Sequence, residues 1–197
     1  MLENDIPIRT GRAHLRHELP SVLEDAENRL SDRLRGLLAR LRAHWEMLEA
    51  HIKDISTELE VVAKTRDDCR RLLTIPGIGP LAATAIVSAV GNGSQFSRGR
   101  QMAAWLGFVP RQHSTGGVPK LLGISKHGNN YLRRLLIHGA RSVYMHMNRE
   151  RFALGRWIDE LQIRAHRNVV VVALANKIAR SCWAILTSGS VYRANSA

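Results

Sequence analysis

The feature that most constrains the fold is a run of apolar residues spaced alternately four and three positions apart. Its members are Leu34, Leu38, Leu41, Trp45, Leu48, Ile52, Ile55, Leu59 and Val62. This spacing keeps one apolar seam on a single helix for about four heptads. We interpret it as a coiled-coil arm over residues 21–68 that joins two copies of the chain in a homodimer. The alternative is a long surface helix on its own domain.

The rest of the chain is expected to be almost entirely helical. Residues 1–20 show no clear period and are expected to be a tail. Residues 69–197 are expected to form a compact C-terminal domain, with a coil punctuated by glycine and proline at 107–123. The four β-branched residues at 169–172 allow a strand, but the length and alanine content of 168–186 favour a helix. The predicted class is therefore all-α, a long coiled-coil arm followed by a helical domain, with further helices at 81–90, 101–106, 129–147 and 156–163.

Residues 70–91 match the helix-hairpin-helix pattern, Leu72-x-x-Ile75-Pro-Gly-Ile-Gly-x-x-x-Ala83-x-x-Ile86. Ile75 and Ile78 are expected to anchor the turn. Gly77 and Gly79 allow close backbone approach, so that amides at the start of the second helix can face a phosphate. Such a contact positions DNA without reading its sequence. The alternative is an ordinary glycine turn in a helical core.

No acidic residue occurs between Asp68 and Glu150, and the chain carries a formal net charge of +12. Such a balance favours nucleic acid as the partner over an anionic membrane surface. Carboxylates normally build Mg²⁺ sites, so no metal site is predicted in this stretch. The two cysteines, Cys69 and Cys182, are far apart and indicate no disulfide framework. Without a signal core or an apolar run of about 18 residues, the chain is expected to be cytoplasmic and nucleoid-associated, with no membrane partner.

Two serines in the loop region 107–128 are candidates for chemistry. Ser114 is followed by two glycines and is close in sequence to Arg111, His113 and Lys120. A serine that attacks a phosphodiester needs exposure, a proton acceptor and cations near the phosphate oxygens. The alternative for Ser114 is an ordinary serine turn.

Ser125 is the second candidate, and it precedes Lys126 and the predicted helix. Lys126 and the helix start have the chemistry to bind a phosphate. In the alternative interpretation Ser125 or Asn129 simply caps that helix.

Taken in order, these segments resemble the C-terminal domain of insertion-sequence-110 family transposases in their 1111-type branch, relatives of site-specific invertases. The resemblance covers about residues 69–188 and is carried by Leu73-Thr-Ile-Pro-Gly-Ile-Gly-Pro, Met102-Ala-Ala-Trp-Leu-Gly-Phe-Val-Pro-Arg-Gln-His-Ser-Thr-Gly-Gly, Leu122-Gly-Ile-Ser-Lys-His-Gly-Asn and Tyr131-Leu-Arg-Arg-Leu-Leu-Ile-His-Gly-Ala-Arg. It implies a DNA recombinase that excises and inserts a mobile element, guided by a structured RNA.

The resemblance also implies roles for individual residues. Ser114 would be the nucleophile that forms a covalent phosphoserine link, and Ser125 is the runner-up. Phosphate ligands would be Arg111, Lys120 and Lys126. The hairpin glycines and the two arginines of the following helix complete the candidate nucleic-acid-binding set, which is Gly77, Gly79, Arg111, Lys120, Lys126, Arg133 and Arg134.

The family also has an N-terminal RuvC-like domain whose carboxylates hold metal, and this chain has no counterpart of it. We therefore expect a truncated transposase that binds DNA, RNA or both. Mg²⁺ is expected only with the missing domain, and without that domain this chain is not expected to cut DNA by itself. The alternative is a non-catalytic nucleic-acid-binding and dimerisation module.

Overall fold

The computed structural model describes residues 6–113 and 120–194. Over these residues the chain forms eight α-helices and one two-stranded sheet, which confirms the all-α class. The chain divides into two compact units, Met1–Ile55 and Ser56–Ala197. The elements are α1 (Arg12–Glu24), α2 (Asp32–Thr65), α3 (Asp67–Leu72), α4 (Pro80–Val90), α5 (Gly99–Trp105), β1 (Pro110–Gln112), β2 (Leu121–Ile124), α6 (Asn130–His146), α7 (Ala153–Arg164) and α8 (Arg167–Ser188).

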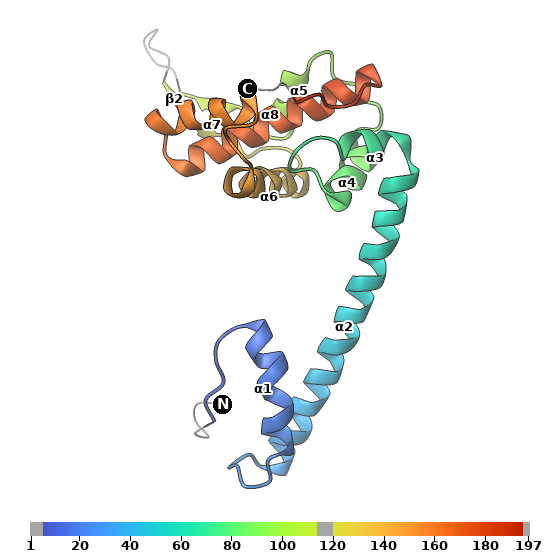
Figure 1. Cartoon of the computed structure of the whole chain (residues 1–197), viewed down its shortest axis with the longest axis vertical. Helices are drawn as coiled ribbons and strands as arrows, with labels where there is room; N and C mark the ends of the chain where they lie inside the picture. The colour runs from blue at the N-terminus through green and yellow to red at the C-terminus, as the bar shows by residue number, and fades with distance from the viewer. Residues whose placement is uncertain (1–5, 114–119, 195–197) are drawn as a thin grey trace. The chain divides into compact units, whose positions relative to one another are not determined.

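In the first unit α1 lies beside the first half of α2 (Figure 1). The predicted tail is thus helical from Arg12 onward, which differs from the expectation. Most of α1 is polar, and Leu19 is its buried residue, so no apolar period marks the helix. Instead, Arg12 and Arg16 pair with Glu49 of α2, and the Arg16 guanidinium lies 5.9 Å from the Trp45 ring centroid. The contact between α1 and α2 therefore includes ion pairs, which leave no apolar period in the sequence of α1.

The helix α2 runs without interruption through the predicted heptads. Its seam residues Leu34, Leu38 and Trp45 are half-buried, whereas Leu41 and Ile55 have exposed fractions of 65% and 57%. The second unit begins at Ser56, inside this helix and earlier than the predicted boundary at residue 69. The last turns of α2 belong to the second unit because Ala63 is fully buried in its core.

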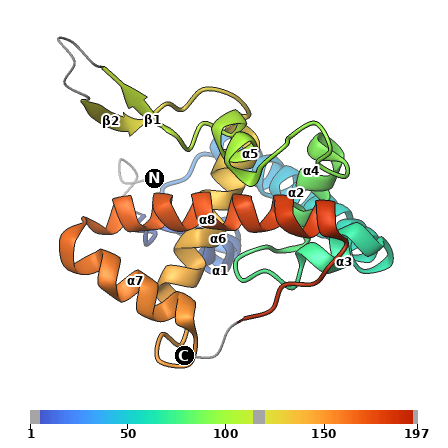
Figure 2. The same ribbon diagram turned by 90° about the horizontal axis from the view of Figure 1, so that it is seen from above.

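The second unit is built on α8, which packs against α3, α5, α6 and α7. Figure 2 shows α8 running across the unit, with α6 crossing it and α7 folding back from its start. The β-branched run at its beginning is helical, as predicted, and Val170 and Val171 are buried. Among the described helices α8 alone is long and apolar enough to cross a membrane by length and composition, and half of that apolar stretch is buried in the fold. Packing in the core accounts for its apolar character.

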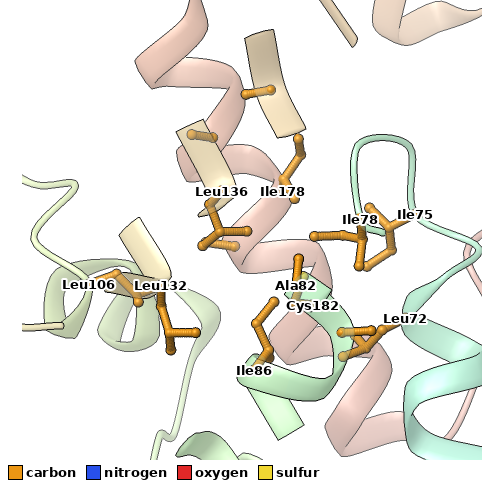
Figure 3. Close-up of a cluster of buried hydrophobic side chains, with 14 of the residues drawn as sticks. Leu72, Ile75, Ile78, Ala82, Ile86, Leu106, Leu132, Leu136, Ile178 and Cys182 are labelled. Atoms are coloured by element: carbon orange, nitrogen blue, oxygen red, sulfur yellow. The ribbon is translucent and has the colours of Figure 1, made fainter. Parts of the chain in front are cut away.

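The glycine hairpin, which is the turn at residues 73–79 between α3 and α4, shares one apolar core with the helices around it (Figure 3). Ile75 and Ile78 point from the hairpin toward Ile178 and Cys182 of α8. Burial of side chains of this size stabilises a fold by about 1.5–3 kcal/mol each. The labelled residues of this core are Leu72, Ile75, Ile78, Ala82, Ile86, Leu106, Leu132, Leu136, Ile178 and Cys182.

The segment predicted as coil at 107–123 contains a short antiparallel ribbon. Pro110 of β1 pairs with Ile124 of β2, and Gln112 pairs with Leu121, with an irregularity between the two pairs. The strands have three and four residues, too short for an alternating apolar pattern to reveal them. The coil prediction is therefore wrong for these residues.

Candidate nucleic-acid interface

The glycine hairpin joins α3 to α4 through a turn held from inside. Ile75 and Ile78 are both buried, and the Ile78 N–H donates to the Ile75 carbonyl oxygen at 3.1 Å. Gly77 has a φ of +85°, a conformation that favours glycine. The order of helix, turn and helix is the one that a phosphate-binding hairpin requires.

The two glycines of the hairpin are in different environments. A β-carbon on Gly77 would lie 2.7 Å from the carbonyl oxygen of Gly139, and one on Gly139 would overlap the carbonyl oxygen of Gly77. The close backbone approach at Gly77 is therefore made to α6, inside the protein. Gly79 is exposed, has nothing within 4 Å of the same position, and caps α4 without a side-chain bond. Of the two, Gly79 is the one whose surroundings leave room for a phosphate.

The β1–β2 ribbon carries the candidate serine segment. Ser114 lies outside the described residues, which stop at His113 and resume at Lys120. These two residues are joined, because the His113 N–H donates to the Lys120 carbonyl oxygen at 2.9 Å. Arg111 and Lys120 are both exposed. One exposed cation, Arg111, thus lies in β1, and the other, Lys120, directly precedes β2.

Ser125 lies at the opposite end of the ribbon from His113. Its N–H donates to the Val109 carbonyl oxygen at 2.8 Å, and the Lys126 N–H donates to that of Gly107 at 3.2 Å. Lys126 has a φ of +58°, unusual for a residue with a β-carbon, and its side chain is exposed. The segment is therefore fixed by backbone bonds in a conformation that carries strain, a frequent property of functional loops.

Asn129, not Ser125, caps α6, since its side chain accepts from the Leu132 N–H at 3.0 Å. This resolves the capping alternative for Ser125. The Ser125 side chain is half-buried, and its hydroxyl makes no hydrogen bond to the described part of the chain. Ser125 therefore remains available for chemistry as far as capping is concerned.

Arg133 and Arg134 are neighbours on α6 with different surroundings. Arg133 is buried, with 7% of its surface exposed. Its guanidinium donates to the carbonyl oxygens of Leu106 and His127, both at 3.0 Å, and to Asn130 Oδ1 at 2.9 Å. Arg133 thus ties the α5 end and the Ser125 segment to α6, which favours a structural role over the predicted phosphate contact. Arg134 is exposed.

The basic residues of the second unit are mostly not neutralised by carboxylates. Arg149 is an exception, since it pairs with Asp159 at 2.6 Å and also donates to the Tyr144 carbonyl oxygen. Arg70 and Arg71 pair with Asp67 at 2.6 and 3.1 Å. The exposed basic residues between Asp68 and Glu150 that make no ion pair within the described ranges are Arg98, Arg100, Arg111, Lys120, Lys126, Arg134 and Arg141. Each of them is an exposed cation in a stretch of the sequence that has no acidic residue.

Neither thiol chemistry nor a metal centre fits the described residues. Burial raises the pKa of the Cys182 thiol to about 12, and burial with nearby Asp68 raises the pKa of the Cys69 thiol to about 11. Both therefore stay protonated and unreactive near neutral pH. Within 6–113 and 120–194, no group of three or more His, Cys, Asp or Glu residues could hold a metal ion. No step involving Mg²⁺ is therefore assigned to these residues.

Sequence reasoning missed two features of this region. The first is Gly139, an isolated glycine inside a predicted helix, whose backbone lies against that of Gly77. The second is Arg180 of α8, which lines a hollow with Arg98 and Arg100. Nothing in the sequence signals that second feature, because the three arginines come together only when α5 packs on α8.

The sequence of the chain is similar to those of known proteins. Residues 69–154 match the family model Transposase IS116/IS110/IS902 family. The chain is 45% identical to a "Probable family 20 transposase" of Pseudomonas aeruginosa over 95% of this chain and 56% of that protein. It is 40% identical to the transposase for insertion sequence element IS1111A of Coxiella burnetii, over 97% of this chain and 52% of that protein.

A shorter match extends to a protein with a different name. Over 33% of this chain and 20% of that protein, it is 36% identical to the pilin gene-inverting protein of Moraxella bovis. The chain spans about half the length of the curated transposases that it matches. It belongs to the IS116/IS110/IS902 transposase family.

Proposed function

We propose that this chain is the DNA-binding, serine-bearing part of the machinery that moves an insertion sequence by transposition, a form of site-specific recombination. One observation carries the proposal: the family match covers the glycine hairpin and both serine segments, in a unit whose exposed cations are largely free of carboxylate partners. The relatives named as transposases and as a pilin gene-inverting protein act on DNA segments by name. A positive, carboxylate-poor surface suits the phosphates of such a substrate.

In the proposed step a serine hydroxyl attacks the phosphorus of a DNA phosphodiester. The bond between Oγ and phosphorus forms, the bond between phosphorus and a sugar oxygen breaks, and the leaving oxygen takes up a proton to become a hydroxyl group. The serine proton passes to a base, for which His113 is the nearest candidate in sequence to Ser114. Exposed Arg111, Lys120 and Lys126 would stabilise the charge on the phosphate oxygens. Ser114 is the proposed nucleophile and Ser125 the second candidate.

Covalent trapping on a nicked DNA substrate tests this proposal. The reaction would contain this chain and the carboxylate-bearing part of a relative, because the family's metal chemistry is expected there. Wild-type protein should give a DNA adduct that survives denaturation, and mass spectrometry should place the phosphate on Ser114. Ser114→Ala should abolish the adduct.

Two controls separate the serines. Ser125→Ala should leave the adduct if Ser114 is the nucleophile, and it should remove the adduct if the assignment is reversed. Ser142→Ala, at an exposed serine of α6, should have no effect. Equal absence of adduct in wild type and in every variant would leave the chain without catalytic function.

The second candidate function is a non-catalytic nucleic-acid-binding and dimerisation module. The exposed apolar residues of the α2 seam favour it, because a long helix with such a face is typical of coiled coils. Both functions share DNA binding, a structured guide RNA as a further partner, and action in the bacterial cytoplasm. They differ in the trapping experiment, where the module gives no adduct while still binding DNA.

A further inference from the structure

A hollow at the junction of α5 and α8 collects three arginines from two elements. Arg98 and Arg100 come from the start of α5, and Arg180 comes from the middle of α8. The hollow has a volume of about 330 Å³ and is open to solvent on one side. Its remaining lining is Gly99, Trp183 and Ala184, so it contains no carboxylate. The hollow shares no residue with the glycine hairpin or the β1–β2 ribbon.

None of the three arginines is neutralised by the protein. Each is exposed, and each lacks an ion pair or a hydrogen bond from its side chain to the described residues. Elsewhere in this unit, arginines such as Arg66 and Arg149 are paired with carboxylates at 2.6 Å. Like charges brought to one hollow repel each other, and an anion would remove that repulsion.

The packing beneath the hollow fixes where these arginines emerge. A β-carbon on Gly99 would lie 3.2 Å from the Arg180 carbonyl oxygen, so the start of α5 rests directly on the α8 backbone. The Trp183 Nε1–H donates to the carbonyl oxygens of Gly93 and Phe96 at 3.3 and 3.0 Å. This ties the loop before α5 to α8 as well. A positively charged site with a fixed base loses less entropy on binding than a flexible one.

The chemistry of the hollow defines the ligand. Guanidinium groups match phosphate oxygens with paired N–H donors, and they are preferred where phosphate is recognised by geometry. The described lining offers three guanidinium groups and no carboxylate or amide side chain, a set of donors that suits the anionic oxygens of a backbone phosphate. We propose that Arg98, Arg100 and Arg180 bind a backbone phosphate of nucleic acid and so form a second point of contact with it. This proposal rests on the proposed DNA-binding function.

Binding measurements on the triple variant R98Q/R100Q/R180Q test the proposal. The probes are a fluorescent 30-base-pair DNA duplex and an RNA hairpin of similar length, titrated at several salt concentrations. The variant should raise Kd roughly tenfold at low salt and lower the slope of log Kd against log salt by about 1. A loss with DNA alone identifies a DNA backbone as the ligand, and a loss with RNA alone identifies RNA.

The matched control is R156Q/R164Q/R167Q, which removes the same charge from exposed arginines of α7 and the start of α8. Its effect should be smaller on both probes. Equal losses of affinity in the two triple variants would mean that binding depends on the net charge of the protein rather than on this hollow. No loss of affinity in R98Q/R100Q/R180Q would also overturn the proposal. Arg98, Arg100 and Arg180 are all exposed, so the thermal midpoint of R98Q/R100Q/R180Q should equal that of the wild type. If the midpoint falls, the three single variants are measured in its place.

The outcome also separates this site from the proposed function. If wild-type protein binds neither probe at low salt, the DNA-binding function itself fails. If wild type binds with a steep salt dependence and R98Q/R100Q/R180Q binds equally well, only the second contact fails.

Discussion

At the scale of single residues, the glycines of the hairpin are constrained by different neighbours. Gly77 needs a positive φ and lies against the Gly139 backbone, while Gly79 needs neither. Gly77 therefore holds the hairpin on α6, and Gly79 leaves the start of α4 open. The close packing against α6 and the open surface at the start of α4 thus belong to two different glycines, which a sequence motif treats alike.

Replacing either glycine of the contact with alanine should destabilise the second unit. Gly77→Ala combines a strained backbone with an overlap against Gly139, so the free energy of unfolding should fall by roughly 2–4 kcal/mol. Gly139→Ala should cost about 1–3 kcal/mol through the overlap alone. Urea unfolding followed by circular dichroism measures both. Gly79→Ala is the control and should change stability by less than about 1 kcal/mol. A Gly77→Ala protein as stable as this control would contradict the close contact.

The candidate site could be predicted from sequence only in part, and the arginines of α6 show why. Arg133 and Arg134 are equivalent by composition and spacing. Their difference arises because one guanidinium points at the carbonyl oxygens of Leu106 and His127, which come from other segments. No local pattern encodes such a contact. By contrast, Asn129 was one of two capping candidates because capping depends on residues close in sequence.

At the scale of elements, the sequence predicts helices correctly where apolar residues recur on one helical face. The predicted helices at 129–147 and 168–186 correspond to α6 (Asn130–His146) and α8 (Arg167–Ser188). The patterns failed at α1 and at the β1–β2 ribbon. The first is held by ion pairs to Glu49, and the second by backbone bonds over very short strands. The ion pairs join residues more than 30 positions apart, and the strands are too short to show an alternating apolar pattern.

The α2 seam makes a prediction about assembly. Leu48 and Ile55 are exposed on the seam, with fractions of 44% and 57%. If they pack against a second copy, the double variant L48Q/I55Q should weaken dimerisation at least tenfold, because burial of each side chain is worth about 1.5–3 kcal/mol. Sedimentation equilibrium measures the dissociation constant of the dimer. A43Q/A50Q, at exposed positions off the seam, is the control and should remain dimeric. A monomeric wild type at high concentration would favour the surface-helix alternative.

At the scale of the whole molecule, charge and core both belong to the second unit. Residues 1–55 contain nine Lys or Arg and ten Asp or Glu. Residues 56–197 contain 20 Lys or Arg and seven Asp or Glu. The main apolar core begins at Ala63 and also lies entirely within the second unit. The proposed nucleic-acid partner should therefore be bound by the second unit.

A fragment of residues 56–197 should fold and bind without the first unit. It should unfold cooperatively, with a thermal midpoint within a few degrees of the full chain, because it keeps the main core. Its affinity for duplex DNA should have the same salt dependence as that of the full chain. Circular dichroism and fluorescence anisotropy measure these properties. A fragment that is unfolded, or one that has lost its affinity for DNA while remaining folded, would show that the first unit takes part.

The place of α8 in the chain order has a consequence for biosynthesis. This helix packs against α3, α5, α6 and α7, all of which precede it. While a ribosome makes the chain, α3, α4 and α6 can contact one another, but the apolar faces that pack on α8 stay uncovered until residues 170–186 have emerged. The second unit therefore completes its core late in synthesis. A message cut before α8 would yield a product without a stable core, recognised by chaperones and proteases before it reached DNA.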